Sequence, residues 1–167
     1  MTGFSARQKT RVVLALATIG LAVWLAAQNT VPFGTFIVVK AVNQLSPWAK
    51  NFWPPTAVYP PERSSNGQWF QRIVISPVTL RVQTPRVFRV VTVLMDADGI
   101  PPGSTVGVAT TLKGTAYVTA ALAPTGATLS LADVDQRERM LQFAFTFPDL
   151  VRAHPVVAHT VRFAFSR

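Results

Sequence analysis

The sequence predicts an all-β antiparallel sandwich of immunoglobulin-like architecture, preceded by one N-terminal transmembrane helix and a short interfacial helical collar. Three observations lead to this fold class. Residues 12–39 carry no charged side chain and begin with an almost wholly apolar run. From Trp69 onward the apolar residues recur with a period of two, as they do in half-buried strands. Short turn motifs rich in Gly, Pro and Asp separate these runs, at a spacing typical of sandwiches.

The apolar run VVLALATIGLAVWLAA predicts a membrane-spanning helix over residues 12–31. About 20 residues at 1.5 Å rise cross the hydrocarbon core of a bilayer. In lipid, the backbone N–H and C=O groups must form hydrogen bonds within their own segment, and a helix provides these hydrogen bonds. A cleaved signal peptide is the alternative, because a basic start and an apolar run also characterise such leaders. Leu25, three residues before the best cleavage position, is larger than the residue that such a site favours.

The flanking charges predict the orientation of this helix. Arg7, Lys9 and Arg11 lie in the tail 1–11, and the next basic residue is Lys40. The positive-inside rule therefore places the N-terminus in the cytoplasm and the remainder outside it, in the periplasm if the membrane is a bacterial inner membrane.

The helix itself contains no ionisable side chain, which argues against ion transport, proton relay and axial ligation of a pigment or haem. Gly20 offers a smooth face for packing against a partner helix. Trp24 is an aromatic residue of the kind that anchors a helix in a membrane.

Residues 32–53 are predicted to form an amphipathic segment on the outer membrane surface. Apolar residues between Val38 and Leu45 recur at helical spacing, which favours one or two short helices. Trp48, Phe52 and Trp53 follow, and amphipathic aromatic rings favour the headgroup level. The same stripe is equally typical of a surface that packs on a neighbouring protein.

Residues 54–68 are predicted to form a stiff arm and a turn. PPTAVYPP at 54–61 favours extended polyproline II, at ~3.1 Å per residue, and thus a spacer of roughly 25 Å. ERSSNGQ at 62–68 is typical of a polar turn.

Residues 69–167 are predicted to form the sandwich outside the cytoplasm. In the second run Val78, Leu80 and Val82 face one way, and in the last run Val157 and His159 share the apolar face. The core tryptophan and disulfide of immunoglobulin domains are missing, and a small barrel is the alternative fold. The predicted strands are 71–76, 78–83, 86–94, 105–111, 115–122, 127–132, 139–147 and 156–166.

Two acidic motifs resemble metal sites but favour simpler interpretations. The sequence Asp96-Ala97-Asp98-Gly99 begins like a calcium loop yet lacks the Glu of the twelfth position, so we expect a hairpin turn. The acidic residues of ADVDQRE lie among basic ones, so we expect a solvated loop with local ion pairs. These acidic residues are Asp133, Asp135 and Glu138, with Arg137 and Arg139 beside them.

The remaining candidates do not form a recognisable catalytic or metal centre. His154 and His159 are the only histidines, and a hydrogen-bonded core or interface role is expected for His159. Ser104 lies in PGSTVG, which is not a nucleophile elbow. The chain has no cysteine, which excludes disulfides, thiolate catalysis and iron–sulfur clusters. We therefore expect no enzyme activity, cofactor or metal.

The net charge of +9 does not predict nucleic-acid binding, because no basic stripe is interleaved with aromatic residues. Residues 1–53 hold five of the basic residues and no acidic one, so part of the excess sets membrane topology.

Two resemblances concern the anchor and the overall plan. Residues 25–39, LAAQNTVPFGTFIVV, resemble the first-helix exit of the lipopolysaccharide assembly protein A family. That family has a second hydrophobic span, which this sequence lacks. The plan of one helix and one β domain is similar to that of accessory subunits around bacterial photosynthetic reaction-centre and light-harvesting assemblies. This resemblance implies a helix beside pigment proteins and a β domain that braces their periplasmic face.

The sequence therefore predicts a non-catalytic, single-pass accessory subunit of a bacterial inner-membrane complex. Its expected partners are membrane subunits through the helix and collar, periplasmic domains through the sandwich, and the lipid bilayer. The alternatives are a free-standing, membrane-anchored binding module and an envelope assembly factor.

Overall fold

A computed structural model of the chain describes residues 14–21, 35–110 and 117–167. The chain divides into two compact units, Met1–Gly34 and Thr35–Arg167. In the first unit residues 14–21 are α-helical and exposed. Among the described residues no helix is long and apolar enough to cross a membrane. The rest of the predicted span 12–31 lies outside the described residues, together with Trp24, Arg7, Lys9 and Arg11.

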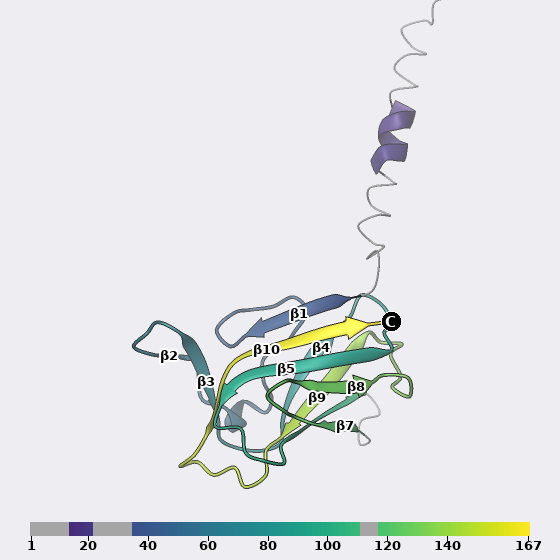
Figure 1. The fold of residues 1–167 in the computed structure, drawn as a ribbon. Helices are drawn as coiled ribbons and strands as arrows, with labels where there is room; N and C mark the ends of the chain where they lie inside the picture. The colour runs from purple at the N-terminus through teal and green to yellow at the C-terminus, as the bar shows by residue number, and fades with distance from the viewer. Residues whose placement is uncertain (1–13, 22–34, 111–116) are drawn as a thin grey trace, which may run out of the picture. The chain divides into compact units, whose positions relative to one another are not determined.

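The second unit consists of two antiparallel sheets that pack as a sandwich (Figure 1). The first sheet has the order β2-β3-β10-β5-β8, with β1 also paired to β10, and the second has the order β4-β9-β6-β7. Their bounds are β1 Phe36–Ala41, β2 Glu62–Arg63, β3 Trp69–Ile73, β4 Val78–Gln83, β5 Val90–Asp98, β6 Thr105–Thr110, β7 Val118–Ala121, β8 Ala127–Ser130, β9 Met140–Thr146 and β10 Val156–Ser166.

All eight predicted strands are present, and β4 and β10 have the predicted bounds. The alternation in β4 is confirmed, because Val78, Leu80 and Val82 are fully buried while the residues between them are not. The aromatic rings of β9 and β10 meet between the sheets, where the ring centroids of Phe143 and Phe163 are 4.5 Å apart. This apolar interior joins the two sheets.

The last strand departs from its predicted alternation at one position. The pairing of β10 with β5 shifts between Ala158 and Thr160, so His159 occupies a β-bulge. Val156 and Ala158 are buried before the bulge, instead of Val157 and His159. The prediction that His159 shares the inner face is therefore wrong, because the bulge resets the period of two.

The predicted helical collar is wrong, because no residue from 35 to 53 is helical. Residues 36–41 form β1, which pairs with β10 from Phe36↔Phe165 to Ala41↔Thr160. Val38 and Lys40 are 3% exposed and point inward. The β-branched run 37–39 favours a strand, and continuous pairing with β10 outweighs the helical spacing of its apolar residues.

The rest of the predicted collar and arm covers one side of the sandwich. The amide of Trp53 donates to the carbonyl of Thr79 on β4, at 2.8 Å. A 3-10 turn, η1 Pro55–Ala57, then crosses to the first sheet, where the amide of Val74 donates to the carbonyl of Ala57 at 2.9 Å. Ala57 is fully buried. The prediction of a stiff, extended polyproline spacer is therefore wrong, because residues 55–59 form a turn and hydrogen-bond to the first sheet at residues 72–74.

Candidate functional site

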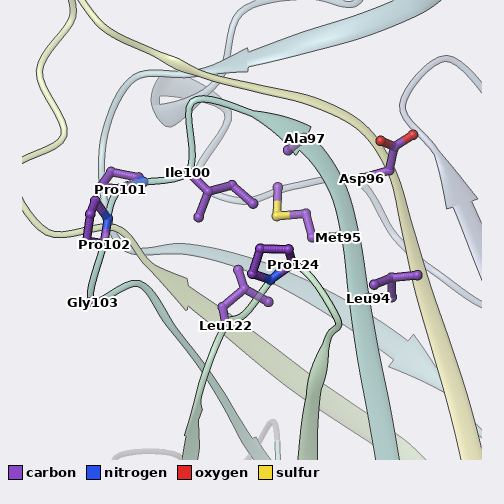
Figure 2. Close-up of a pocket in the computed structure, with 10 residues that line it drawn as sticks. All are labelled: Leu94, Met95, Asp96, Ala97, Ile100, Pro101, Pro102, Gly103, Leu122 and Pro124. Atoms are coloured by element: carbon purple, nitrogen blue, oxygen red, sulfur yellow. The ribbon is translucent and has the colours of Figure 1, made fainter.

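An apolar groove of about 710 Å³ opens at the end of the sandwich where β5 finishes. Figure 2 shows its side chains around a common space, with Met95 and Ile100 opposite Leu122 and Pro124. Asp96 is the only carboxylate among its lining residues, and its side chain turns away from the apolar cluster (Figure 2). We call this feature the apolar groove.

The wall of the apolar groove is a fixed turn after β5. Gly99 and Gly103 have φ of +73° and +78°, which glycine adopts without steric cost. Ser104 is 2% exposed, and its hydroxyl donates to the carbonyl of Pro101 at 2.7 Å. The carbonyl of Ser104 in turn accepts from the amide of Leu122 at 2.8 Å. Ser104 therefore holds the groove in shape, and its hydroxyl is already engaged.

The chemistry of the apolar groove suits binding. The side chains that line it are mainly aliphatic and prolyl, and these contribute free energy through burial rather than through bond making. The hydroxyl of Ser104 does not face a histidine or a carboxylate. A concave apolar surface with few polar groups is typical of a binding site.

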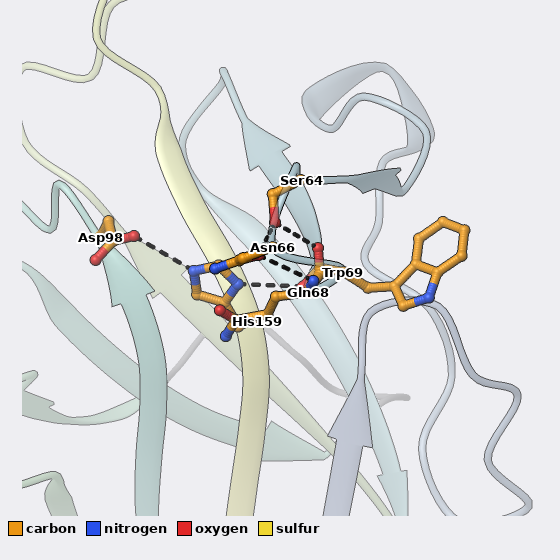
Figure 3. A network of polar contacts seen from close by, with 6 residues as sticks. All are labelled: Ser64, Asn66, Gln68, Trp69, Asp98 and His159. Carbon is orange, nitrogen blue, oxygen red and sulfur yellow. Dashed lines mark hydrogen bonds and ion pairs between the residues drawn. The ribbon is translucent and has the colours of Figure 1, made fainter.

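A histidine, His159, lies at the junction of three strands (Figure 3). The Nδ1 of His159 is 3.1 Å from the carbonyl oxygen of Trp69, and its Nε2 is 3.3 Å from the carboxylate of Asp98. The backbone carbonyl of His159 accepts from the amide of Val42, just after β1. His159 thus bridges β5 and β3 at the point where β1 ends. The expected hydrogen-bonded role of this residue is confirmed, although it lies in the bulge rather than in the core.

Both ring nitrogens of His159 face oxygen acceptors. Only the protonated imidazole can donate to both at once. Burial by itself lowers the pKa of His159. Four contributions raise the pKa by more than burial lowers it: the hydrogen bonds to the Trp69 carbonyl and to Asp98, and the negative charges of Asp96 and Asp98. The net pKa lies above its usual value, so protonation strengthens this junction.

The acidic motifs take different positions. Asp96 and Asp98 belong to β5, and the turn after them leads from β5 in the first sheet to β6 in the second, so the prediction of a hairpin turn here is wrong. Asp135 and Arg137 form a local ion pair of 2.5 Å in an exposed loop, as expected. Within the described ranges, no three His, Asp or Glu side chains lie close enough together to hold a metal ion.

The predicted anchor residues separate into exposed and buried ones. Gly20 lies in the described helical stretch with no heavy atom within 4 Å of the place that a Cβ would occupy. Trp48 and Trp53 are 39% and 62% exposed. Phe52 is 5% exposed and packs edge-on against Phe145 in the core. Phe52 is therefore a core residue rather than a membrane anchor, because the segment carrying it lies along β4.

Two residues were missed by sequence reasoning. Lys40 is buried on the inner face of β1 and donates from Nζ to the carbonyl of Gln44. Gln136 is 5% exposed and bonds to the backbone of Phe88. The burial of Lys40 could have been predicted from a strand alternation that puts it on the same face as Val38. Nothing in ADVDQRE distinguishes Gln136 from its exposed neighbours.

No protein-family model matches this chain, and neither does any curated protein or solved structure. The function is therefore inferred from the residues and their geometry.

Proposed function

We propose that this chain is a non-catalytic accessory subunit of a larger bacterial inner-membrane complex. Its apolar N-terminal segment anchors it in the bilayer as a single span, with the N-terminus in the cytoplasm. Its sandwich, of immunoglobulin-like architecture, lies in the periplasm and braces neighbouring subunits there.

The observation that carries this proposal is the short distance along the chain between the apolar run and the sandwich. The run ends at Ala27, and β1 begins at Phe36. At ~3.6 Å per residue, residues 28–35 reach about 29 Å when fully extended. A sandwich on so short a connection stays near the bilayer surface, where it meets membrane subunits rather than distant soluble ligands.

The apolar groove provides the surface for such a neighbour. Leu94, Pro102 and Pro124 are exposed there and offer apolar area to an aliphatic or proline-containing segment of a partner subunit. The resemblance in plan to accessory subunits of photosynthetic reaction-centre and light-harvesting assemblies makes these the first complexes to test.

The experiment is a purification of the tagged full-length chain from its native membrane in a gentle detergent. Mass spectrometry identifies the co-purified subunits, and an absorption spectrum of the intact particle detects pigments. The proposal predicts a large particle in which the chain is present at constant stoichiometry. Near-infrared pigment bands would assign that particle to a photosynthetic complex.

A small, colourless particle containing this chain alone would contradict the accessory role. That outcome would favour a free-standing, membrane-anchored binding module. Constant co-purification with lipopolysaccharide transport or synthesis proteins would instead favour the envelope assembly factor.

A further inference from the structure

A second groove, of about 720 Å³, lies at the opposite end of β5 from the apolar groove. Two loops form it, 84–89 before β5 and 131–139 between β8 and β9. Its floor includes Phe88, Leu131 and Val134, and its rim carries the guanidinium groups of Arg89, Arg137 and Arg139. We call it the arginine groove.

The two loops of the arginine groove are held together by one buried side chain. The amide nitrogen of Gln136 donates to the carbonyl of Phe88 at 2.7 Å, and its amide oxygen accepts from the Phe88 amide at 3.0 Å. The same nitrogen donates to the carbonyl of Leu131 at 3.2 Å. This pairing fixes the floor before any ligand binds, which lowers the entropic cost of binding.

The residues that line the arginine groove include three arginines and no carboxylate. Asp133, Asp135 and Glu138 lie on the same loop 131–139, outside that lining. Arg137 pairs with Asp135 just outside the groove, and Arg139 donates to the carbonyl of Pro85. Arg89 is exposed. A planar guanidinium matches a phosphate through two parallel hydrogen bonds, so this rim suits a phosphate ester.

The arginine groove lies at the end of the sandwich where β1 begins. The amide of Arg89 donates to the carbonyl of Ser166 at 3.0 Å, and the adjoining Phe165 pairs with Phe36, the first residue of β1. Val87, on the same loop, is 55% exposed. The Trp48 ring lies 5.3 Å from the Phe36 ring and is partly exposed. This end thus combines arginines with exposed apolar side chains.

We propose that the arginine groove binds the phosphate-bearing headgroup of an anionic phospholipid. The inference rests on the proposed membrane anchoring, because residues 28–35 keep the first residue of β1 within about 29 Å of the end of the apolar run. The arginines contact the headgroup phosphate, and the apolar floor covers the upper part of the glycerol ester. Trp48 and Val87 lie in the interfacial layer. The headgroup contact orients the sandwich so that the apolar groove faces away from the membrane.

The test is calorimetric titration of the full-length chain in a neutral detergent. Three probes are compared: short-chain phosphatidylglycerol, short-chain phosphatidylcholine and inorganic phosphate. The proposal predicts saturable binding of phosphatidylglycerol that is at least about tenfold tighter than binding of either other probe. The double variant R89Q/R137Q should weaken it at least about tenfold, since both side chains are exposed and their removal leaves the core intact.

The matched control is R81Q/R152Q, which removes the same charge from exposed positions outside the groove. It should change the affinity less than about twofold. The single variant R89Q, checked for fold by circular dichroism, provides a second reading if the double variant is unstable. Equal binding of phosphate and phosphatidylglycerol would identify a free-anion site and overturn the lipid assignment. Equal losses in the double variant and its control would also overturn it, because bulk charge would then explain the binding.

The two proposals fail separately. A chain that co-purifies with partner subunits but does not bind phosphatidylglycerol would keep the accessory role and lose the headgroup site. A chain that binds phosphatidylglycerol but elutes alone would keep the headgroup site and lose the accessory role.

Discussion

The imidazole Nε2 of His159 lies 3.3 Å from the carboxylate of Asp98, and this contact joins β10 to the end of β5. The other ring nitrogen faces the carbonyl of Trp69 at the start of β3. The side chain of His159 is 13% exposed, whereas that of Asp98 is 84% exposed. One ring thus connects three strands at the bulge of the C-terminal strand.

The first prediction concerns the pH dependence of stability. Because the pKa of His159 is raised in the folded chain, its contribution is complete below its unfolded value of about 6.5. The contribution is lost as the pH rises through the folded pKa. Thermal unfolding should therefore show a lower midpoint at about pH 8.5 than at about pH 5.5, and H159Q should flatten this difference.

The control for this prediction is His154, the second histidine, which lies in an exposed turn. H154Q should keep the wild-type pH dependence. If H154Q removed the dependence and H159Q kept it, the bridging role of His159 would be wrong.

The second prediction concerns Gln136, which joins the two loops of the arginine groove. Q136A leaves the buried amide and carbonyl of Phe88 without their side-chain partner, whereas the carbonyl of Leu131 still accepts from the amide of Val134. We expect a loss of about 2–4 kcal/mol in the free energy of unfolding, measured by chemical denaturation. Q83A, at an exposed position on β4, should cost less than about 0.5 kcal/mol. Equal effects of the two variants would contradict the locking role of Gln136.

The third prediction concerns Lys40, whose charge is buried on β1. Burial lowers the pKa of Lys40 from its ordinary 10.5, because desolvation disfavours the charged form. K40M should therefore raise the free energy of unfolding by about 1 kcal/mol at neutral pH. The gain should shrink as the pH rises from the folded pKa of Lys40 and vanish only above 10.5, where the wild-type amine is neutral in both states. A destabilised K40M with an unchanged pH profile would show that the hydrogen bond to Gln44 outweighs desolvation.

The fourth prediction concerns the apolar groove as the partner surface. L94D places a charge in this groove at a residue that is 37% exposed, and this should abolish co-purification of partner subunits while the sandwich stays folded. I75D introduces the same charge at a residue that is 40% exposed and outside the groove. It should leave co-purification intact. Retention of the partners by L94D would locate their binding surface elsewhere.

The sequence was sufficient to place most of the strands. In β4 the alternation of Val78, Leu80 and Val82 has no competing helical pattern, and Pro77 marks its start. Residues 35–42 fit the spacing of a helix and also that of a strand. Val38 and Val42 are four residues apart, as on one face of a helix, whereas Val38 and Lys40 are two apart, as on one face of a strand. Pairing with β10 decides between them. That partner lies more than a hundred residues away in the sequence, so local reasoning could not include it.

The candidate sites were less accessible to sequence reasoning. The bulge at His159 arises from the register between β10 and β5, which a period of two does not encode. Both grooves include loop residues that meet only after the sheets have packed. The proline-rich segment 54–61 illustrates the same limit, since its composition favours an extended chain but its bridge from Val58 to Ile73 depends on the folded first sheet.

The most direct test of the central claim is the topology of the chain in the membrane, and the absence of cysteine makes it straightforward. Two single-cysteine variants, S5C in the N-terminal tail and A153C in an exposed loop of the sandwich, are treated with a membrane-impermeant maleimide in intact spheroplasts. The account predicts that A153C is labelled at once and that S5C is labelled only after lysis, with both variants resisting extraction by alkaline carbonate. Labelling of S5C but not A153C, or release of the chain by carbonate, would contradict it.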